Sequence, residues 1–193
     1  MKNLINLTDE QLIKLFNDGE TSAMEVLINR HKERIFTSVY LLVKDKYLAE
    51  DIFQDLFIKI IETFRAGKYK EENKFAQWAM RIGHNLCVDH FRRIKNKPVI
   101  RTSDGTDIFD VLNFEEANAE DKIMKMQSSE RIMKLVSKLP EDQREIIILR
   151  HFADLKFREI SIILDCSVNT ALGRMRYALL NLRKLIEEKQ IAL

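Results

Sequence analysis

Polar and basic side chains near the C-terminus recur in a pattern suited to hydrogen bonding with nucleic acid. Residues 166–184 hold four basic residues and no acidic one. Amide, hydroxyl and guanidinium groups can pair with base edges and phosphates, and backbone N–H groups at a helix start add a phosphate site. A glycine inside a helix costs about 1 kcal/mol, which close approach of a DNA backbone would explain. The candidates are Ser167, Asn169, Thr170, Gly173, Arg174, Arg176 and Tyr177.

The alternative interpretation of this stretch is a solvated basic face on an ordinary helical hairpin. A second basic stretch, residues 68–101, holds nine basic and three acidic residues and therefore carries a local charge of +6. Positive charge at this density suits phosphate contacts. Trp78 within it could stack on a base, but its spacing with Phe75 and Ile82 places it on an apolar helical face, which favours core packing.

An acidic group lies further towards the N-terminus. Asp51, Gln54 and Asp55 are at positions i, i+3 and i+4, so they share one helical face. Such a face suits a basic partner surface, and a solvated acidic face is the alternative. Apolar residues repeat at steps of three and four on the opposite side of the same segment: Ala49, Ile52, Phe53, Leu56, Phe57, Ile60 and Phe64.

Residue patterns typical of enzymes are missing from the sequence. His84 and His90 are six positions apart and do not share a helical face with which to bind a metal, and there is no His-Glu-x-x-His, paired cysteine, P-loop or Gly-x-Ser-x-Gly motif. Cys87 and Cys166 lie in apolar surroundings, which favours inert packing in a reducing cytosol. We expect no catalysis, no cofactor and no metal site.

The elements that position these groups are predicted to be helices. The chain has 193 residues with only 5 Gly and 2 Pro, 46% apolar and 32% charged residues, which favours an all-α soluble protein. Its net charge of +2 argues at first against a nucleic-acid binder, but this charge is distributed very unevenly. We expect no secretory signal, because the first eleven residues have no long apolar core, and no uncharged run approaches the ~18 residues that would span a membrane.

Capping boxes at 8–11 and 22–25 predict helices that end near Asn17 and Val43. The acidic segment predicts a third helix that Gly67 can end in a left-handed conformation. A fourth helix is predicted from Phe75 to Arg93, with its buried face formed by Phe75, Trp78, Ala79, Ile82 and Leu86. In the second half, helices are predicted at 141–152, with Pro140 at the start, at 157–164, and from a Ser167 cap onwards, after a break at 165–166.

Residues 96–121 interrupt this periodicity and contain seven acidic and two basic residues. We expect two small helical domains, 1–95 and 122–193, joined by a linker at 96–121. A helix, a short corner and a longer helix over 156–184 form a helix-turn-helix pattern.

The C-terminal segment resembles region four of the extracytoplasmic-function (ECF) sigma factors of bacteria. Leu139-Pro140, then Phe157, Glu159, Ile160 and Ser161, then Ser167, Thr170, Arg174 and Ala178 match the family's pattern, while Asp165, Ala171 and Gly173 depart from it. The sequence Asn-Thr-Ala-Leu-Gly-Arg-Met-Arg at 169–176 resembles a Bacteroidota-type variant of this region. The resemblance implies that the helix starting at Ser167 reads the upstream promoter element.

The N-terminal half resembles region two of the same family in residues 49–57 and 75–93. This implies that Asp51, Gln54 and Asp55 bind the clamp helices of the polymerase largest subunit. It also implies that the loop before Phe75 and the following helix bind the downstream promoter element, with one base flipped into a pocket near the loop. The implied DNA contacts are Lys74, Arg81, His84, Asn85, Asp89, Arg92 and Arg93, with Asn85 as the polar base contact.

The chain is therefore identified as a member of the ECF sigma factors, a cytoplasmic transcription initiation factor and not an enzyme. Its expected partners are core RNA polymerase, through the clamp helices and the flap, promoter DNA and an anti-sigma factor. We hypothesise that the linker is held extended in a polymerase channel, with the apolar residues between Phe109 and Phe114 as a docking element. A polymerase-independent helix-turn-helix regulator and a helical adaptor or inhibitor are the alternatives.

Overall fold

The computed structural model describes residues 4–70, 74–95 and 132–188, and within these ranges every regular element is helical. The chain divides into two compact units, Met1–Arg101 and Thr102–Leu193. The prediction of two helical domains is confirmed. The predicted linker at 96–121 lies outside the described residues.

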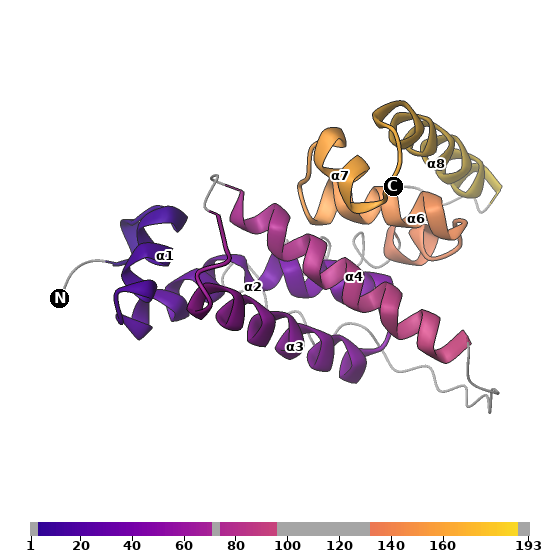
Figure 1. Cartoon of the computed structure of the whole chain (residues 1–193). Helices are drawn as coiled ribbons and strands as arrows, with labels where there is room; N and C mark the ends of the chain where they lie inside the picture. Colours follow the sequence, from indigo (N-terminus) through magenta and orange to yellow (C-terminus); the bar gives the residue numbers. More distant parts are fainter. Residues whose placement is uncertain (1–3, 71–73, 96–131, 189–193) are drawn as a thin grey trace, which may run out of the picture. The chain divides into compact units, whose positions relative to one another are not determined.

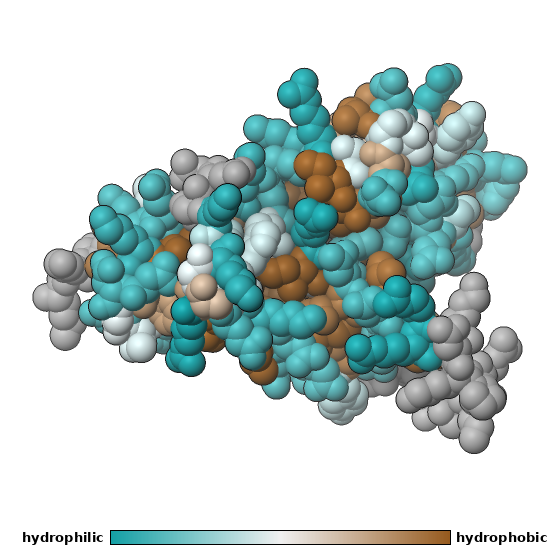
Figure 2. All heavy atoms as spheres, in the orientation of Figure 1, coloured by the Kyte–Doolittle hydropathy of each residue, from teal (hydrophilic) through white to brown (hydrophobic). Residues whose placement is uncertain are grey.

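The described residues of the first unit form a short 3-10 helix and four α-helices. These are η1 (Leu4–Asn6), α1 (Asp9–Asn17), α2 (Thr21–Val43), α3 (Lys46–Arg65) and α4 (Phe75–Lys95). The three long helices α2, α3 and α4 pack on one another, and α1 packs mainly on α2 (Figure 1). The face visible in Figure 2 is mainly hydrophilic and interrupted by small hydrophobic patches.

Capping explains where the first helices begin. Thr8 forms the predicted capping box, since its hydroxyl accepts from the Gln11 N–H at 3.3 Å and the Gln11 side chain accepts from the Thr8 N–H at 2.9 Å. The second predicted capping box is wrong. Gly19 reverses the chain at φ +102°, so α2 begins at Thr21 with Glu20 as its N-cap, and the Ser22 hydroxyl donates to the Glu20 carboxylate instead.

A polar cluster fastens the N-terminal segment to α2. The Asp9 carboxylate is 2.6 Å from an Arg30 nitrogen and 2.8 Å from His31 Nε2, and Arg30 also donates to the carbonyls of Ile5 and Leu7. Burial raises the pKa of Asp9, but hydrogen bonds and charge from His31 and Arg30 outweigh it and hold the pKa below its usual value. The His31 ring in turn lies 5.2 Å from the Phe75 ring at the start of α4.

The buried face of α4 is rotated relative to the predicted one. The fully covered positions are Phe75, Ala79, Met80, Gly83, His84 and Cys87, whereas Trp78, Ile82 and Leu86 are only half-buried. The Trp78 ring lies at the edge of this core, 5.9 Å from the Phe64 ring and 4.5 Å from the Tyr69 ring. Trp78 is thus a packing residue, but in a peripheral aromatic cluster.

The second unit contains helical residues 132–136, α6 (Glu141–Ile147), η3 (Ile148–Phe152), α7 (Phe157–Ile163) and α8 (Val168–Glu188). Pro140 is the N-cap of α6. The predicted helix 141–152 is present, but its second half, η3, has π-helical instead of α-helical winding. Its side chains Ile148 and Leu149 are fully buried, so packing of this apolar run accompanies the change in helical winding.

Candidate functional site

The corner between α7 and α8 lies where the sequence predicts an interruption between two helices, at residues 165–166. Asp165 adopts a left-handed φ of +46°, and the Cys166 N–H donates to the Ser161 carbonyl at 3.0 Å. Ser167 then caps α8, since its hydroxyl accepts from the Thr170 N–H at 3.0 Å and lies 2.8 Å from the Thr170 hydroxyl. Helix, left-handed corner and capped second helix give the helix-turn-helix geometry.

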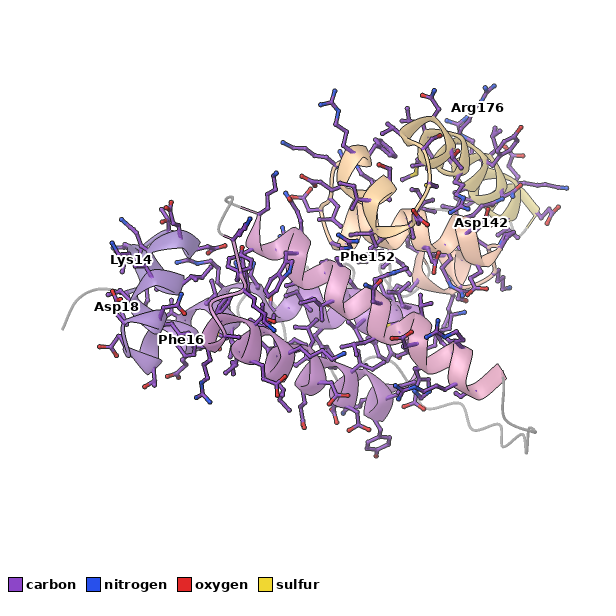
Figure 3. All side chains as sticks on the ribbon, in the orientation of Figure 1. Lys14, Phe16, Asp18, Asp142, Phe152 and Arg176 are labelled. Carbon is purple, nitrogen blue, oxygen red and sulfur yellow. The ribbon has the colours of Figure 1, made fainter. Side chains whose placement is uncertain are left out.

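The exposed side of α8 gathers most of the predicted DNA contacts. Its opposite side is buried through Ala171, Met175 and Ala178, which pack into the unit. We call the exposed side the recognition face, and it contains Asn169, Gly173, Arg176 and Tyr177. Tyr177 is 63% exposed, and Arg176 extends from the outer side of α8 (Figure 3).

Glycine is not required at position 173 by packing inside the protein. A Cβ atom built on Gly173 meets no atom within 4 Å. The space beside this part of the backbone is therefore open to a ligand, although a helix interior normally disfavours glycine by about 1 kcal/mol relative to alanine.

Arg174 differs from the other predicted contacts because it lies at the edge of the recognition face. Its Nε is 3.7 Å from a carboxylate oxygen of Asp142 on α6, and it is only half-exposed. A second polar bridge joins the same helices seven residues further on, where the Asn181 side chain donates to Gln143 at 2.8 Å. Arg174 therefore joins α8 to α6 as well as lying near the face.

A basic stripe follows the exposed side of α4. Lys74, Arg81, Asn85 and Arg92 are exposed and are separated by seven, four and seven positions, which places them on one helical face. We call these four residues the downstream face, which extends over about 27 Å at 1.5 Å per residue. Asp89 is 2.9 Å from an Arg92 nitrogen and so orients it, and Arg93 is exposed beside the stripe.

His84 is a correction to the predicted DNA contacts. It is 5% exposed and lies on the buried side of α4 with Gly83 and Cys87, so its side chain is not presented on the downstream face. Sequence inspection overlooked Val88, which is 43% exposed and offers an apolar contact between Asn85 and Arg92. Its position, three residues after Asn85, was the available signal.

Asp51, Gln54 and Asp55 are all exposed on α3, as a docking surface requires, and we call them the acidic face. Asp45 is the N-cap of this helix, and its carboxylate accepts from the Leu48 N–H at 3.0 Å. Within the part of the chain that the structure describes, no group of three His, Cys, Asp or Glu residues is arranged to hold a metal ion. No described helix is long and apolar enough to cross a membrane.

Comparison with known proteins identifies both units. Residues 27–97 match the model of sigma-70 region 2, and residues 129–181 match that of sigma-70 region 4. The chain is also 27% identical over 185 residues to the ECF RNA polymerase sigma factor SigW of Bacillus subtilis, covering 91% of this chain and 95% of the relative. This chain belongs to the ECF sigma factors. It is a transcription initiation factor, the function that both regions and the relatives support.

Other comparisons agree with this family. The sigma factor is 27% identical over 177 residues to the ECF RNA polymerase sigma-E factor of Escherichia coli, with 88% of this chain and 89% of the relative covered. Its fold is similar to that of CnrH, solved with the cytosolic domain of CnrY, at a TM-score of 0.64, 20% identity and coverages of 93% and 97%. It is similar as well to RpoE of Bartonella quintana, solved with the anti-sigma factor NepR. The TM-score is 0.63 and the identity 17%, with 85% of this chain and 96% of RpoE covered.

Proposed function

We propose that this sigma factor binds core RNA polymerase through the acidic face and directs it to promoters through its two DNA faces. The observation that carries the proposal is the capped helix α8, which presents Asn169, Arg176 and Tyr177 to solvent from a helix-turn-helix. An exposed row of amide, guanidinium and phenol groups at the start of such a helix is suited to base edges in the major groove. The upstream promoter element is the proposed ligand.

The downstream face would bind the second promoter element. Lys74, Arg81 and Arg92 provide cations for phosphates along one strand, and Asn85 provides an amide that can read a base. Once the strands separate, unpaired bases can be read singly.

An open surface pocket supports the expectation of a base-binding site near the loop before Phe75. It has a volume of about 470 Å³ and lies at the end of α3, where that loop begins. Its lining combines two aromatic rings with amide, hydroxyl and guanidinium groups: Phe16, Asn17, Gly19, Thr21, Phe64, Arg65 and Gly67. This combination suits a flipped base, which stacks on an aromatic ring and hydrogen-bonds through its edge.

Polymerase dependence follows from the distribution of charge. The net charge is only +2, so we expect weak binding of the isolated protein to DNA and tight promoter binding when polymerase contributes. The flap is the proposed second polymerase contact, and the cytoplasm is the proposed location because the polymerase works there. Since the similar fold of Bartonella quintana RpoE was solved with an anti-sigma factor, we propose such an inhibitor as a further partner.

Run-off transcription with purified core polymerase on a genomic template library tests this function. We expect promoter-dependent transcripts, and their absence would overturn the proposal. The double variant Asp51→Ala, Asp55→Ala should weaken polymerase binding while sparing the DNA contacts. Tight promoter binding without polymerase, together with no effect of this double variant, would instead support a polymerase-independent regulator, and no DNA contact at all would support an adaptor.

A further inference from the structure

Two large apolar side chains extend the acidic face at both ends. Tyr47 is 76% exposed and Ile58 is 53% exposed, although both lie within α3. At roughly 100° per residue, Tyr47 and Ile58 fall within the same sector of the helix as Asp51, Gln54 and Asp55. We call these five residues the α3 stripe, in which an acidic centre separates two apolar ends about 16 Å apart along the helix axis.

The core of the unit does not need either apolar end. The inner side of α3 is already covered through Ala49, Ile52, Leu56 and Ile60, each of which is 5% exposed or less. Phe53 packs elsewhere, with its ring 5.6 Å from that of Phe36. The core of the first unit therefore does not use Tyr47 or Ile58, and both side chains are available to a partner.

We infer that Tyr47 and Ile58 are apolar anchors that insert into two sockets on either side of a basic patch on RNA polymerase. The inference rests on the proposed function, since the acidic face between the anchors is the proposed polymerase contact. A polymerase surface that covers the acidic face along α3 also covers Tyr47, one turn before it, and Ile58, one turn after it. A continuous partner surface of basic and apolar character complements the whole α3 stripe.

The two kinds of side chain in the stripe act on different steps of binding. Exposed charge pairs add little affinity but steer encounter and set its salt dependence. Tyrosine and other large side chains that become fully desolvated hold a complex together and are enriched among interface hot spots. The anchors therefore control the dissociation rate, and Asp51 with Asp55 controls the association rate.

The test measures association and dissociation rates of the full-length sigma factor on immobilised core polymerase. We expect Tyr47→Ala and Ile58→Ala each to raise the dissociation rate about tenfold with little change in the association rate. Tyr47→Phe, which keeps the aromatic ring, should dissociate at nearly the wild-type rate. Asp51→Asn with Asp55→Asn should lower the association rate and its salt dependence. Ile5→Ala is the matched control, since Ile5 is 73% exposed but lies on η1.

The outcomes separate this inference from the proposed function. The inference alone is overturned if the wild-type protein binds polymerase but both anchor variants dissociate at the wild-type rate or no faster than Ile5→Ala. A wild-type protein that does not bind polymerase would overturn both. Self-association of the free protein that is lost in Tyr47→Ala and Ile58→Ala would assign the stripe to a second copy and would also overturn the inference.

Discussion

Gly83 of α4 faces Leu56 of α3 so closely that a Cβ atom at Gly83 would lie 2.9 Å from Leu56 Cδ1. The same atom would lie 3.3 Å from Val39 Cγ2 of α2. The three long helices of the first unit therefore approach one another at a point where a side chain at position 83 would have to displace Leu56 or Val39. This close approach sets the rotation of α4, and with it the direction of the downstream face.

Gly83→Ala should destabilise the first unit although alanine is the better helix former. Overpacking costs about 1–3 kcal/mol, which outweighs the gain of about 1 kcal/mol in helix propensity. Trp78 is the single tryptophan of the chain and lies in this unit, so its fluorescence in a urea titration reports the change. A midpoint at or above that of the wild type would contradict the packing described for α4.

Gly173→Ala should have the opposite effect on stability. The added Cβ meets no atom within 4 Å, so the gain in helix propensity, about 1 kcal/mol, is realised. We expect the same variant to bind promoter DNA less tightly in the polymerase complex, because the methyl group fills space that a DNA backbone would approach. Unfolding followed by circular dichroism and promoter binding measure the two effects, and unchanged promoter affinity would show that DNA does not approach Gly173.

Arg176→Ala should impair promoter binding more than Arg174→Ala does. Arg176 lies on the recognition face, and loss of a specific base contact costs about 1–3 kcal/mol. Arg174 is engaged with Asp142 across α6 and α8, so its replacement should act partly on stability. Competition binding with mutated upstream elements checks this order. Equal losses of affinity, with no change in stability for Arg174→Ala, would place Arg174 on the DNA instead.

Asp9→Asn should destabilise the protein at neutral pH and less so in acid. The folded pKa of Asp9 is lowered from 3.8, so its ionised form contributes stability that is present above the unfolded value and is lost as the pH falls through the folded value. Hydrogen bonds to a charged group contribute about 1.5–3 kcal/mol each, so the free energy of unfolding of Asp9→Asn at pH 7 should be lower by an amount of this order. Thermal unfolding of both proteins at pH 7 and below 3.8 gives the comparison. A difference that stays constant with pH would contradict the role of the Asp9 charge.

Local patterns in the sequence predicted much of the fold. The Thr8 capping box, the Ser167 cap and the corner at Asp165 depend on residues within a few positions of one another, and the structure contains all three. The predicted start of α2 at a Ser22 cap was wrong, because the chain turns at Gly19, which has a positive φ, and the helix begins directly afterwards at Thr21. The apolar run that forms the π-helix Ile148–Phe152 is predicted from the sequence as an ordinary helix, because π winding is rare and confined to short stretches.

The sequence by itself determined that the chain is helical, that it carries two basic stretches and an acidic face, and which family it resembles, since these depend on composition, spacing and motif. Only the tertiary structure decided which side of each helix remains open. Periodicity placed Trp78, Ile82 and Leu86 on the inner face of α4, but the crossing with α2 and α3 at Gly83 buries His84 and Cys87 instead. Burial is set by contacts between distant segments, and for the same reason the exposure of Tyr47 and Ile58 became visible only in the folded unit.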